Sequence, residues 1–367
     1  MFIRVPRRSI FLLVFAVSGL SAHGDTNSDA CANDSIEAKV GGLAIQKHIP
    51  GIAVAVAREG RVIYSFGYGR ANLEDDVPVS PEHSRFRVGS ISKAFTAFAL
   101  VNLADRGQLD LDVPIQTYVP AFPNAQPGVT LRRLAGHLAG IRGYNSQNEL
   151  ASTIDYPTVE SSLAVFAHDP LVATPGEKFV YSAYGYTLIS AAIESGVHTD
   201  FLSYMSESVF NRLGLSETVP DRPEKIVPGR TGFYYLDGDE LRNGPPINSS
   251  YKWAGAGFLS SATDLARFGM AHFDPKILSP AARSLLWTSQ RTNSGESTGY
   301  GMGWFIGPNW VQHSGGTVGG SGLLRIYPEE ELIVVILANL SMLGEEVFGE
   351  LPDELRACFD RTQAQMP

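Results

Sequence analysis

The sequence predicts a mixed α/β (α+β) fold, in which an antiparallel sheet from both chain ends is flanked by helices and a mainly helical lobe is inserted. Two β-rich runs, residues 51–57 and 62–66, flank a Gly-containing turn, and a similar pair lies at 323–327 and 332–338. Helix-like segments and long Pro/Gly loops fill the stretch between them. We therefore expect one domain over 25–367. Its sheet lobe would span about 25–90 and 255–367, and its helical lobe about 91–254.

The first 24 residues have the order of segments found in secretory signal peptides. Arg4, Arg7 and Arg8 precede an apolar run over residues 10–17, and small residues follow as far as Gly24. This run is too short to span a bilayer, and no longer apolar run follows it. We expect cleavage near Asp25, a periplasmic or secreted mature protein, and no transmembrane segment in the mature chain. An uncleaved N-terminal anchor is the alternative.

Composition and motifs exclude several classes of function. The chain has a formal net charge of −9 at pH 7, and an acidic protein repels phosphate backbones, so we expect no nucleic-acid partner. The eight histidines are scattered, with no His-Glu-x-x-His and no paired cysteines, so we expect no metal and no cofactor. The Gly-x-Ser-x-Gly motif of α/β-hydrolases does not occur in the sequence.

Ser90 and Lys93 form the most informative pair in the sequence. Ten of the fourteen residues from 91 to 104 are apolar or Ala and they cover every face, which predicts a helix buried inside the domain. Side chains three residues apart share one helix face, and burial lowers the pKa of a lysine. Lys93 could then accept a proton from Ser90, which makes Ser90 a candidate nucleophile. The alternative is an ordinary helix start, with Ser90 as N-cap and Lys93 in water.

A second Ser-x-x-Lys sequence occurs at Ser249–Lys252. It is followed by Trp253-Ala-Gly-Ala-Gly257, whose glycines disfavour a continuing helix. We expect this copy to lie on a loop and to have no catalytic role.

Two further motifs follow Ser90 along the chain. They are Tyr181-Ser-Ala-Tyr-Gly-Tyr186 and His313-Ser-Gly-Gly-Thr-Val-Gly319. Together with Arg87-Val-Gly-Ser-Ile-Ser-Lys93, they resemble the three signatures of the penicillin-recognising serine hydrolases. That superfamily holds class C β-lactamases, D-Ala-D-Ala carboxypeptidases and related esterases. Segments 131–144 and 251–261 are most similar to its branch of mitochondrial serine β-lactamase-like proteins and their bacterial relatives.

The resemblance implies a serine hydrolase that forms an acyl-enzyme on Ser90 with peptide, ester or β-lactam substrates. One alternative is a D-Ala-D-Ala carboxypeptidase or penicillin-binding protein, and another is an inactive relative that binds peptidoglycan or a protein. The implied residues are Ser90, Lys93, Tyr181 and His313 for catalysis, the backbone N–H groups of Ser90 and Gly316 for the oxyanion hole, and Ser314, Gly315 and Gly316 for substrate binding.

The chain departs from the β-lactamase pattern at two positions. Ala183 stands where β-lactamases of this type have an Asn that steadies the catalytic lysine, and His313 stands where a Lys is common. Both changes argue against efficient β-lactam hydrolysis. An unperturbed His titrates near pH ~6.5, so we expect His313 to bind a substrate carboxylate when protonated. The alternative is a neutral His313 that orients Tyr181 or Ser90.

The two cysteines, Cys31 and Cys358, lie near opposite ends of the mature chain. In an exported protein an even number of cysteines favours a disulfide, which we expect between these two. A helix over residues 345–358 could bring Cys358 to a first helix near residues 36–46. Two separate free thiols are the alternative.

Overall fold

The computed structural model describes residues 31–123, 128–344 and 348–359. The expected signal peptide lies outside the described residues, as do residues 345–347 of the expected terminal helix. None of the described helices is long and apolar enough to cross a membrane.

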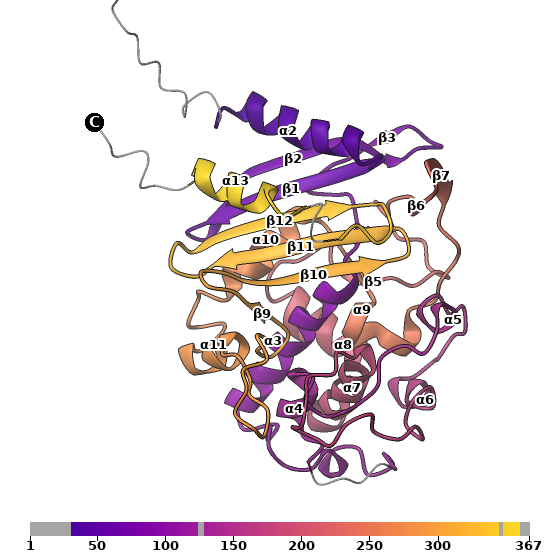
Figure 1. Ribbon diagram of the computed structural model, residues 1–367, viewed down its shortest axis with the longest axis vertical. Helices are drawn as coiled ribbons and strands as arrows, with labels where there is room; N and C mark the ends of the chain where they lie inside the picture. Colours follow the sequence, from indigo (N-terminus) through magenta and orange to yellow (C-terminus); the bar gives the residue numbers. More distant parts are fainter. Residues whose placement is uncertain (1–30, 124–127, 345–347, 360–367) are drawn as a thin grey trace, which may run out of the picture.

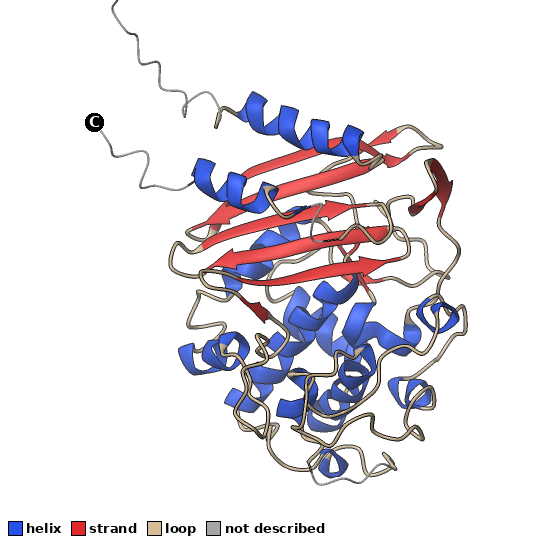
Figure 2. Cartoon of the chain, viewed as in Figure 1, coloured by secondary structure: helices blue, strands red, loops and turns tan. Residues whose placement is uncertain are grey.

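Both ends of the chain supply the central sheet, as expected. Its strands are β1 (Gly51–Arg58), β2 (Arg61–Asn72), β3 (Val77–Pro78), β9 (Phe305–Ile306), β10 (Val311–Thr317), β11 (Gly320–Tyr327) and β12 (Leu332–Ala338). In the described part of the chain they lie in the order β3-β2-β1-β12-β11-β10-β9, and neighbouring strands are antiparallel (Figure 2). Because β1 pairs with β12, with Ile52 opposite Ala338, the sheet joins the two ends of the chain. The predicted α+β fold is confirmed.

The residues of β1 show how the sheet separates two hydrophobic layers. Side chains alternate between the faces of a strand. Ile52, Val54 and Val56 pack in one cluster with α2 (Asn33–Gln46) and α13 (Leu351–Phe359). The alternate positions, Ala53, Ala55 and Ala57, pack in the other cluster with α10 (Ala262–Ala271) and the helical lobe. Figure 1 shows α2 and α13 on one face of the sheet and the helical lobe on the other.

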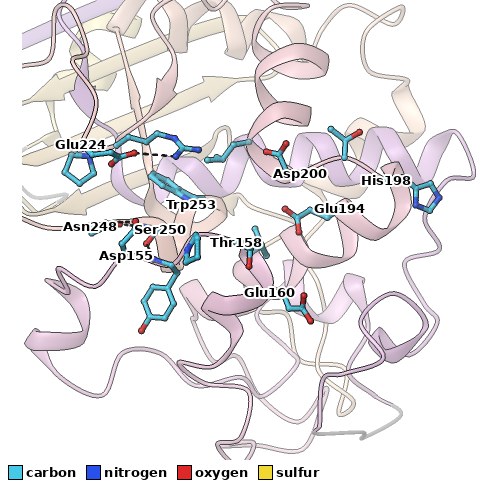
Figure 3. A pocket seen from close by; sticks show the side chains of 17 residues that line it. Asp155, Thr158, Glu160, Glu194, His198, Asp200, Glu224, Asn248, Ser250 and Trp253 are labelled. Atoms are coloured by element: carbon cyan, nitrogen blue, oxygen red, sulfur yellow. Dashed lines mark hydrogen bonds and ion pairs between the residues drawn. The ribbon is translucent and has the colours of Figure 1, made fainter.

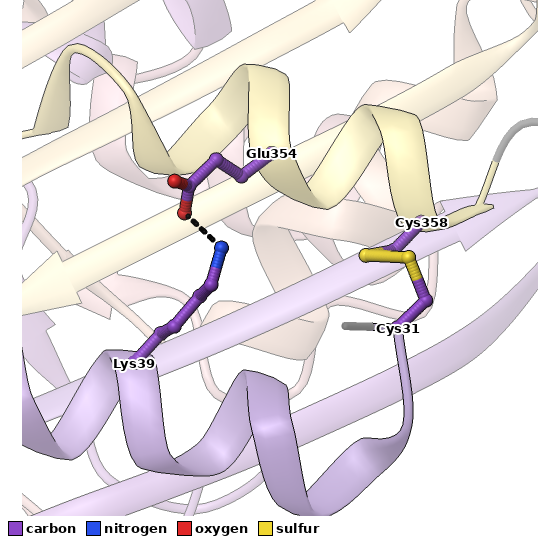
Figure 4. Close-up of a disulfide and its surroundings, with 4 residues drawn as sticks. All are labelled: Cys31, Lys39, Glu354 and Cys358. Atoms are coloured by element: carbon purple, nitrogen blue, oxygen red, sulfur yellow. Dashed lines mark ion pairs between the residues drawn. A yellow bond between two sulfur atoms is a disulfide. The ribbon is translucent and has the colours of Figure 1, made fainter. Parts of the chain in front are cut away.

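The helices at the two ends of the described chain are joined covalently. Cys31 and Cys358 form a disulfide with their Cα atoms 5.0 Å apart (Figure 4). Lys39 of α2 and Glu354 of α13 also form an ion pair of 3.1 Å across the same two helices. The two cysteines that we expected to pair therefore form a disulfide on the outer face of the sheet, which is the face covered by α2 and α13.

The helical lobe surrounds α3 (Ser92–Asp105), of which eleven residues are buried. The other helices are α4 (Leu131–Ala135), α5 (Gln147–Leu150), α6 (Val159–Leu163), α7 (Ala183–Val197), α8 (Phe201–Tyr204), α9 (Trp253–Ala256) and α11 (Pro280–Trp287). Short turns of helix lie at η1 (Gly89–Ile91), η2 (Ile115–Thr117), η3 (Met205–Phe210) and η4 (Ser250–Lys252). Small strands are β4 (Phe86–Arg87), β5 (Val219–Pro220), β6 (Tyr234–Asp237), β7 (Glu240–Asn243) and β8 (Phe258–Ser260).

The two lobes are less cleanly separated along the chain than the sequence suggested. The β6–β7 hairpin lies within the segment expected to be helical. Conversely, α10 and α11 lie in the segment assigned to the sheet lobe, and α10 packs against β1 and β12. The apolar face of the sheet that points toward the helical lobe has to be covered by helices, and α10 is one of the helices that cover it.

Candidate active site

Ser90 lies in the η1 turn directly before α3, next to strand β10. Gly89 has a φ of +50°, and a Cβ there would come within 2.8 Å of the Gly316 backbone nitrogen. A Cβ on Gly315 would lie 1.9 Å from the carbonyl oxygen of Val88. Glycine at these positions therefore allows β10 to approach the Ser90 turn closely. Ser90 is half-buried and Gly316 is exposed, so a substrate can reach both.

Lys93 is fully buried in the first turn of α3. Its Nζ lies 3.0 Å from Ser90 Oγ, which is the contact that the sequence spacing predicts. Burial, and then the nearby charge of Lys252, lower the pKa of Lys93 to about 7. A lysine with this pKa is neutral in a large fraction of molecules at neutral pH, so its amine can accept the proton of Ser90.

Besides Ser90, a backbone carbonyl also contacts Lys93. Lys93 Nζ donates to the carbonyl oxygen of Gly255 at 2.8 Å. Gly255 packs against Ala183, because a Cβ at position 255 would lie 3.1 Å from the Ala183 Cβ. Although Ala183 offers no side-chain hydrogen bond, Lys93 therefore still has a hydrogen-bond partner in the Gly255 carbonyl. We could not have identified Gly255 from sequence, since any residue has a carbonyl.

Tyr181 lies at the opening of the site, with 38% of its surface exposed. Lys93 Nζ is 4.7 Å from the centre of its ring. Burial of the phenol among its neighbours raises the pKa of Tyr181 above its usual value, and a hydrogen bond with Ser90 partly opposes this rise. The phenol therefore keeps its proton at neutral pH, which suits a group that donates a proton to a leaving group.

His313 is buried, and our expectation that it titrates near neutrality is wrong. Only 1% of its surface is exposed, and burial together with the charge of Lys93 lowers its pKa to about 3. Its Nδ1 lies 2.6 Å from the carbonyl oxygen of Ser314 and its Nε2 lies 3.1 Å from the Tyr300 hydroxyl. A neutral ring satisfies both contacts when Nδ1–H donates to Ser314 and Nε2 accepts from Tyr300.

The His313 motif begins within strand β10. Strand β9 pairs only with Val311 and Gln312 of β10, so the ladder on that side of β10 ends before the motif. Beyond that point Gly315 and Gly316 border the Ser90 turn. The backbone N–H groups of Ser90 and Gly316, expected to form an oxyanion hole, thus belong to two segments in close contact.

The second Ser-x-x-Lys sequence was expected on a loop, and this placement is wrong, because three of its four residues form the η4 turn of helix. Ser249 and Lys252 are both buried, and Lys252 directly precedes α9. Lys252 Nζ donates to the carbonyl oxygen of Leu150 at 2.8 Å and lies above the rings of Tyr144 and Tyr251. Burial lowers its pKa to about 7. In the sequence, the neighbouring aromatic residues Tyr251 and Trp253 are the feature that could have indicated that Lys252 is buried.

A cavity of about 800 Å³ lies beside α6 and the end of α7, and Ser250 and Trp253 are among the residues that line it. Figure 3 shows carboxylates around it, and none of the four residues predicted to be catalytic lines it. Asp155 accepts from Asn248 at 3.0 Å, and Glu224 from Arg222 at 3.5 Å.

The model of the family described as Beta-lactamase matches residues 33–353 of the chain. The chain belongs to the beta-lactamase family. Among its relatives, the human "Serine beta-lactamase-like protein LACTB, mitochondrial" is 30% identical, over 80% of this chain and 74% of the human protein. Penicillin-binding protein 4* of Bacillus subtilis is 27% identical, over 80% of this chain and 69% of that protein.

Solved structures agree with this family membership. The octameric penicillin-binding protein homologue from Pyrococcus abyssi is 28% identical, with a TM-score of 0.70 over 83% of this chain and 73% of that chain. A class C beta-lactamase, 18% identical, shares the fold with a TM-score of 0.75 over 92% of this chain and 99% of that chain. Members of the family are serine hydrolases that act through an acyl-enzyme, so this beta-lactamase-family protein is a serine hydrolase.

Proposed function

We propose that Ser90 is the nucleophile of this serine hydrolase, that Lys93 is its base and that Tyr181 protonates the leaving group. The 3.0 Å contact between a fully buried Lys93 and Ser90 Oγ carries the proposal. Lys93 takes the hydroxyl proton as Ser90 Oγ attacks the acyl carbon. The N–H groups of Ser90 and Gly316 stabilise the oxyanion. Tyr181 gives its proton to the departing alcohol or amine and regains one from Lys93, and water then releases the acyl group.

We propose neutral esters and amides as the substrate class. A carboxylate-bearing substrate, such as a D-Ala-D-Ala peptide or a β-lactam, is bound best by a nearby cation. The neutral His313 is no such cation, and the Arg142 guanidinium already binds Glu149 and Asp169. Beside Gly316 lies an apolar side chain, since Met342 Sδ is 3.6 Å from where a Gly316 Cβ would be. Met342 is 64% exposed and can contact a substrate.

The nucleophile is tested by covalent labelling with a fluorophosphonate. Wild-type protein and Ser249→Ala are expected to be labelled, whereas Ser90→Ala is not and loses about 10³-fold or more in turnover. Labelling of Ser90→Ala at another residue would contradict the assignment. Because Ser249 is buried with its own Ser-x-x-Lys sequence, Ser249→Ala is a matched control.

The substrate class is tested with a panel on a single preparation. We expect a neutral p-nitrophenyl ester to be hydrolysed with a higher kcat/KM than a D-Ala-D-Ala peptide or nitrocefin. The reverse order would favour a carboxypeptidase or β-lactamase. If the fluorophosphonate labels the protein but no substrate of the panel is hydrolysed, the result would favour an inactive relative that binds peptidoglycan or a protein.

We propose, further, that the protein is exported. The basic, apolar and small segments of residues 1–24 support this, as does the Cys31–Cys358 disulfide, since disulfides persist in oxidising compartments. Mass spectrometry of the protein from a secreting host should find an N-terminus near Asp25. An intact N-terminus in the membrane fraction would instead indicate an uncleaved anchor.

A further inference from the structure

We propose that His137 is a positioning residue that holds Tyr181 in place for proton transfer. The inference rests on the role proposed above for Tyr181. His137 lies in the segment 131–144, to which the sequence analysis gave no function.

His137 forms hydrogen bonds to the residues on both sides of Tyr181. Its backbone carbonyl accepts the N–H of Val180 at 2.8 Å, and its imidazole Nδ1 accepts the N–H of Ser182 at 3.2 Å. In an extended segment the N–H groups of residues i and i+2 point to the same side. One residue therefore fixes the backbone just before and just after Tyr181. The imidazole contact is the part that depends on the side chain.

The ring of His137 also packs directly on the ring of Tyr181. The two ring centroids are 4.3 Å apart. The centroid of the Tyr300 ring lies 4.8 Å from that of His137, so the three rings form one aromatic cluster. His137 is 2% exposed. The imidazole thus restrains both the backbone and the side chain of Tyr181, which is otherwise exposed at the opening of the site. Tyr300 also donates to His313, so one aromatic cluster contacts two of the predicted catalytic residues.

The conformation of His137 comes at a cost that suggests a specific role. Its φ of +57° is in the left-handed region, which is uncommon for residues other than Gly, although His, Asn and Asp adopt it more often than other residues. Its Nε2 is buried with no hydrogen-bond partner among the described residues. Because Nδ1 accepts from Ser182, the neutral ring carries its proton on this unpaired Nε2, and a buried unpaired N–H is unfavourable. Burial lowers the pKa of His137 well below its usual value, consistent with a neutral ring.

The loop that carries His137 has other contacts, so a substitution should leave it docked. The carbonyl of Leu138 accepts the N–H of Gly176 at 2.7 Å, and that of Gly140 accepts the N–H of Val172 at 2.9 Å. These bonds, and the one to Val180, involve only backbone atoms. A side-chain substitution at His137 therefore removes the bond to Ser182 and the ring contact, while the loop keeps its path.

The test compares His137→Leu, His137→Asn and Tyr181→Phe by steady-state kinetics. We expect His137→Leu to lower kcat about 10- to 100-fold with KM within about twofold, since small misplacement of a catalytic group costs rate. His137→Asn should recover most of the rate, because its amide oxygen can accept the Ser182 N–H and Asn tolerates a positive φ. Equal losses in both variants, or a loss in KM alone, would overturn the proposal.

The leaving group provides a readout that a purely structural defect would not change. If Tyr181 protonates the leaving group, His137→Leu and Tyr181→Phe should each slow an alkyl ester more than a p-nitrophenyl ester, whose leaving group needs no proton. The double variant should be no slower than Tyr181→Phe, because the two residues act as one unit. Additive losses would overturn the role of His137. If Tyr181→Phe itself keeps full activity, the proposed function of Tyr181 fails instead.

His272 provides a matched control. It too is buried, with Nδ1 3.0 Å from the Phe268 carbonyl and an Nε2 without a partner among the described residues. It packs against Trp287 and Trp304 rather than Tyr181. His272→Leu is expected to lower Tm while keeping kcat and the ratio between the two esters. A change in that ratio in His272→Leu would show that the readout reports stability, and would overturn the proposal.

Discussion

Gly255 accepts a hydrogen bond from Lys93 at 2.8 Å through its backbone carbonyl, whereas Ala183 has no side-chain hydrogen bond to offer. The amine is thus bonded to Ser90 on one side and to α9 on the other. Since α9 follows Lys252 directly, the position of the base depends on a segment far from it in sequence.

Gly255→Ala should lower kcat by about tenfold or more, because a misplaced base is costly. A Cβ at this position would lie 3.0 Å from the Ala183 carbonyl oxygen and 3.1 Å from its Cβ, so either α9 or the start of α7 must move slightly, which would alter the contact between the Gly255 carbonyl and Lys93. Steady-state kinetics on a neutral ester measure the effect. Gly42→Ala serves as control, because a Cβ there meets nothing within 4 Å. Unchanged kcat in Gly255→Ala would show that the Gly255 carbonyl is dispensable.

The pH dependence of kcat/KM on a neutral ester should reflect Lys93. Its neutral form is the base, so activity should rise with pH through about 7 and then level off. Lys252→Met removes a nearby positive charge, which makes protonated Lys93 less unfavourable and should move the midpoint to higher pH. Lys39→Met, a surface change, should not move it. A midpoint that stays the same in Lys252→Met would exclude the electrostatic coupling.

His313→Lys should lower kcat on neutral and anionic substrates alike, by about tenfold or more. The buried lysine would lack the acceptor for the Tyr300 hydroxyl and would place a second positive charge near Lys93. In wild-type protein, KM for an anionic substrate should stay flat between pH ~5.5 and ~8, because a His with a pKa of about 3 stays neutral there. A KM that falls as the pH drops below ~6.5 would restore the carboxylate-binding role.

Met342→Arg should improve binding of substrates that end in a carboxylate. The side chain lies beside Gly316 and is exposed, so a guanidinium there could bind the carboxylate, worth about tenfold in KM. KM for the neutral ester should hardly change. Met342→Gln tests whether size alone matters. Equal KM changes for both substrates would place Met342 outside the substrate path.

Replacing both Cys31 and Cys358 with Ser should destabilise the protein by about 2–5 kcal/mol without altering kcat. The disulfide lies on the outer face of the sheet, across it from the helical lobe (Figure 4). Thermal unfolding of the oxidised wild type and the double variant measures the difference. Glu354→Gln, which breaks only the exposed ion pair with Lys39, should change Tm far less. Alkylation of two thiols in native, non-reduced protein would contradict the disulfide.

The sequence was most informative where the signal is periodic or local. The β-rich runs at the two chain ends and the apolar run of α3 predicted the sheet and the buried helix, and the spacing of Ser90 and Lys93 predicted their contact. It failed where the environment comes from distant segments. Burial by residues far along the chain lowers the pKa values of His313 and Lys252. The Gly255 carbonyl is a functional group that every residue possesses, so no sequence pattern marks it.

The pairing of β1 with β12 also determines when this protein can fold. Ile52 and Ala338 are neighbours in the sheet, so β1, which pairs with β2 in the N-terminal hairpin, gains its second neighbour only when almost the whole chain is present. Contacts between residues so distant in sequence slow folding, and an unpaired strand can associate with other chains meanwhile. The η1 turn and β10 come from opposite halves of the chain as well. Neither an isolated N-terminal half nor a C-terminal half can therefore carry the active site, and a truncation that removes either η1 or β10 should abolish activity.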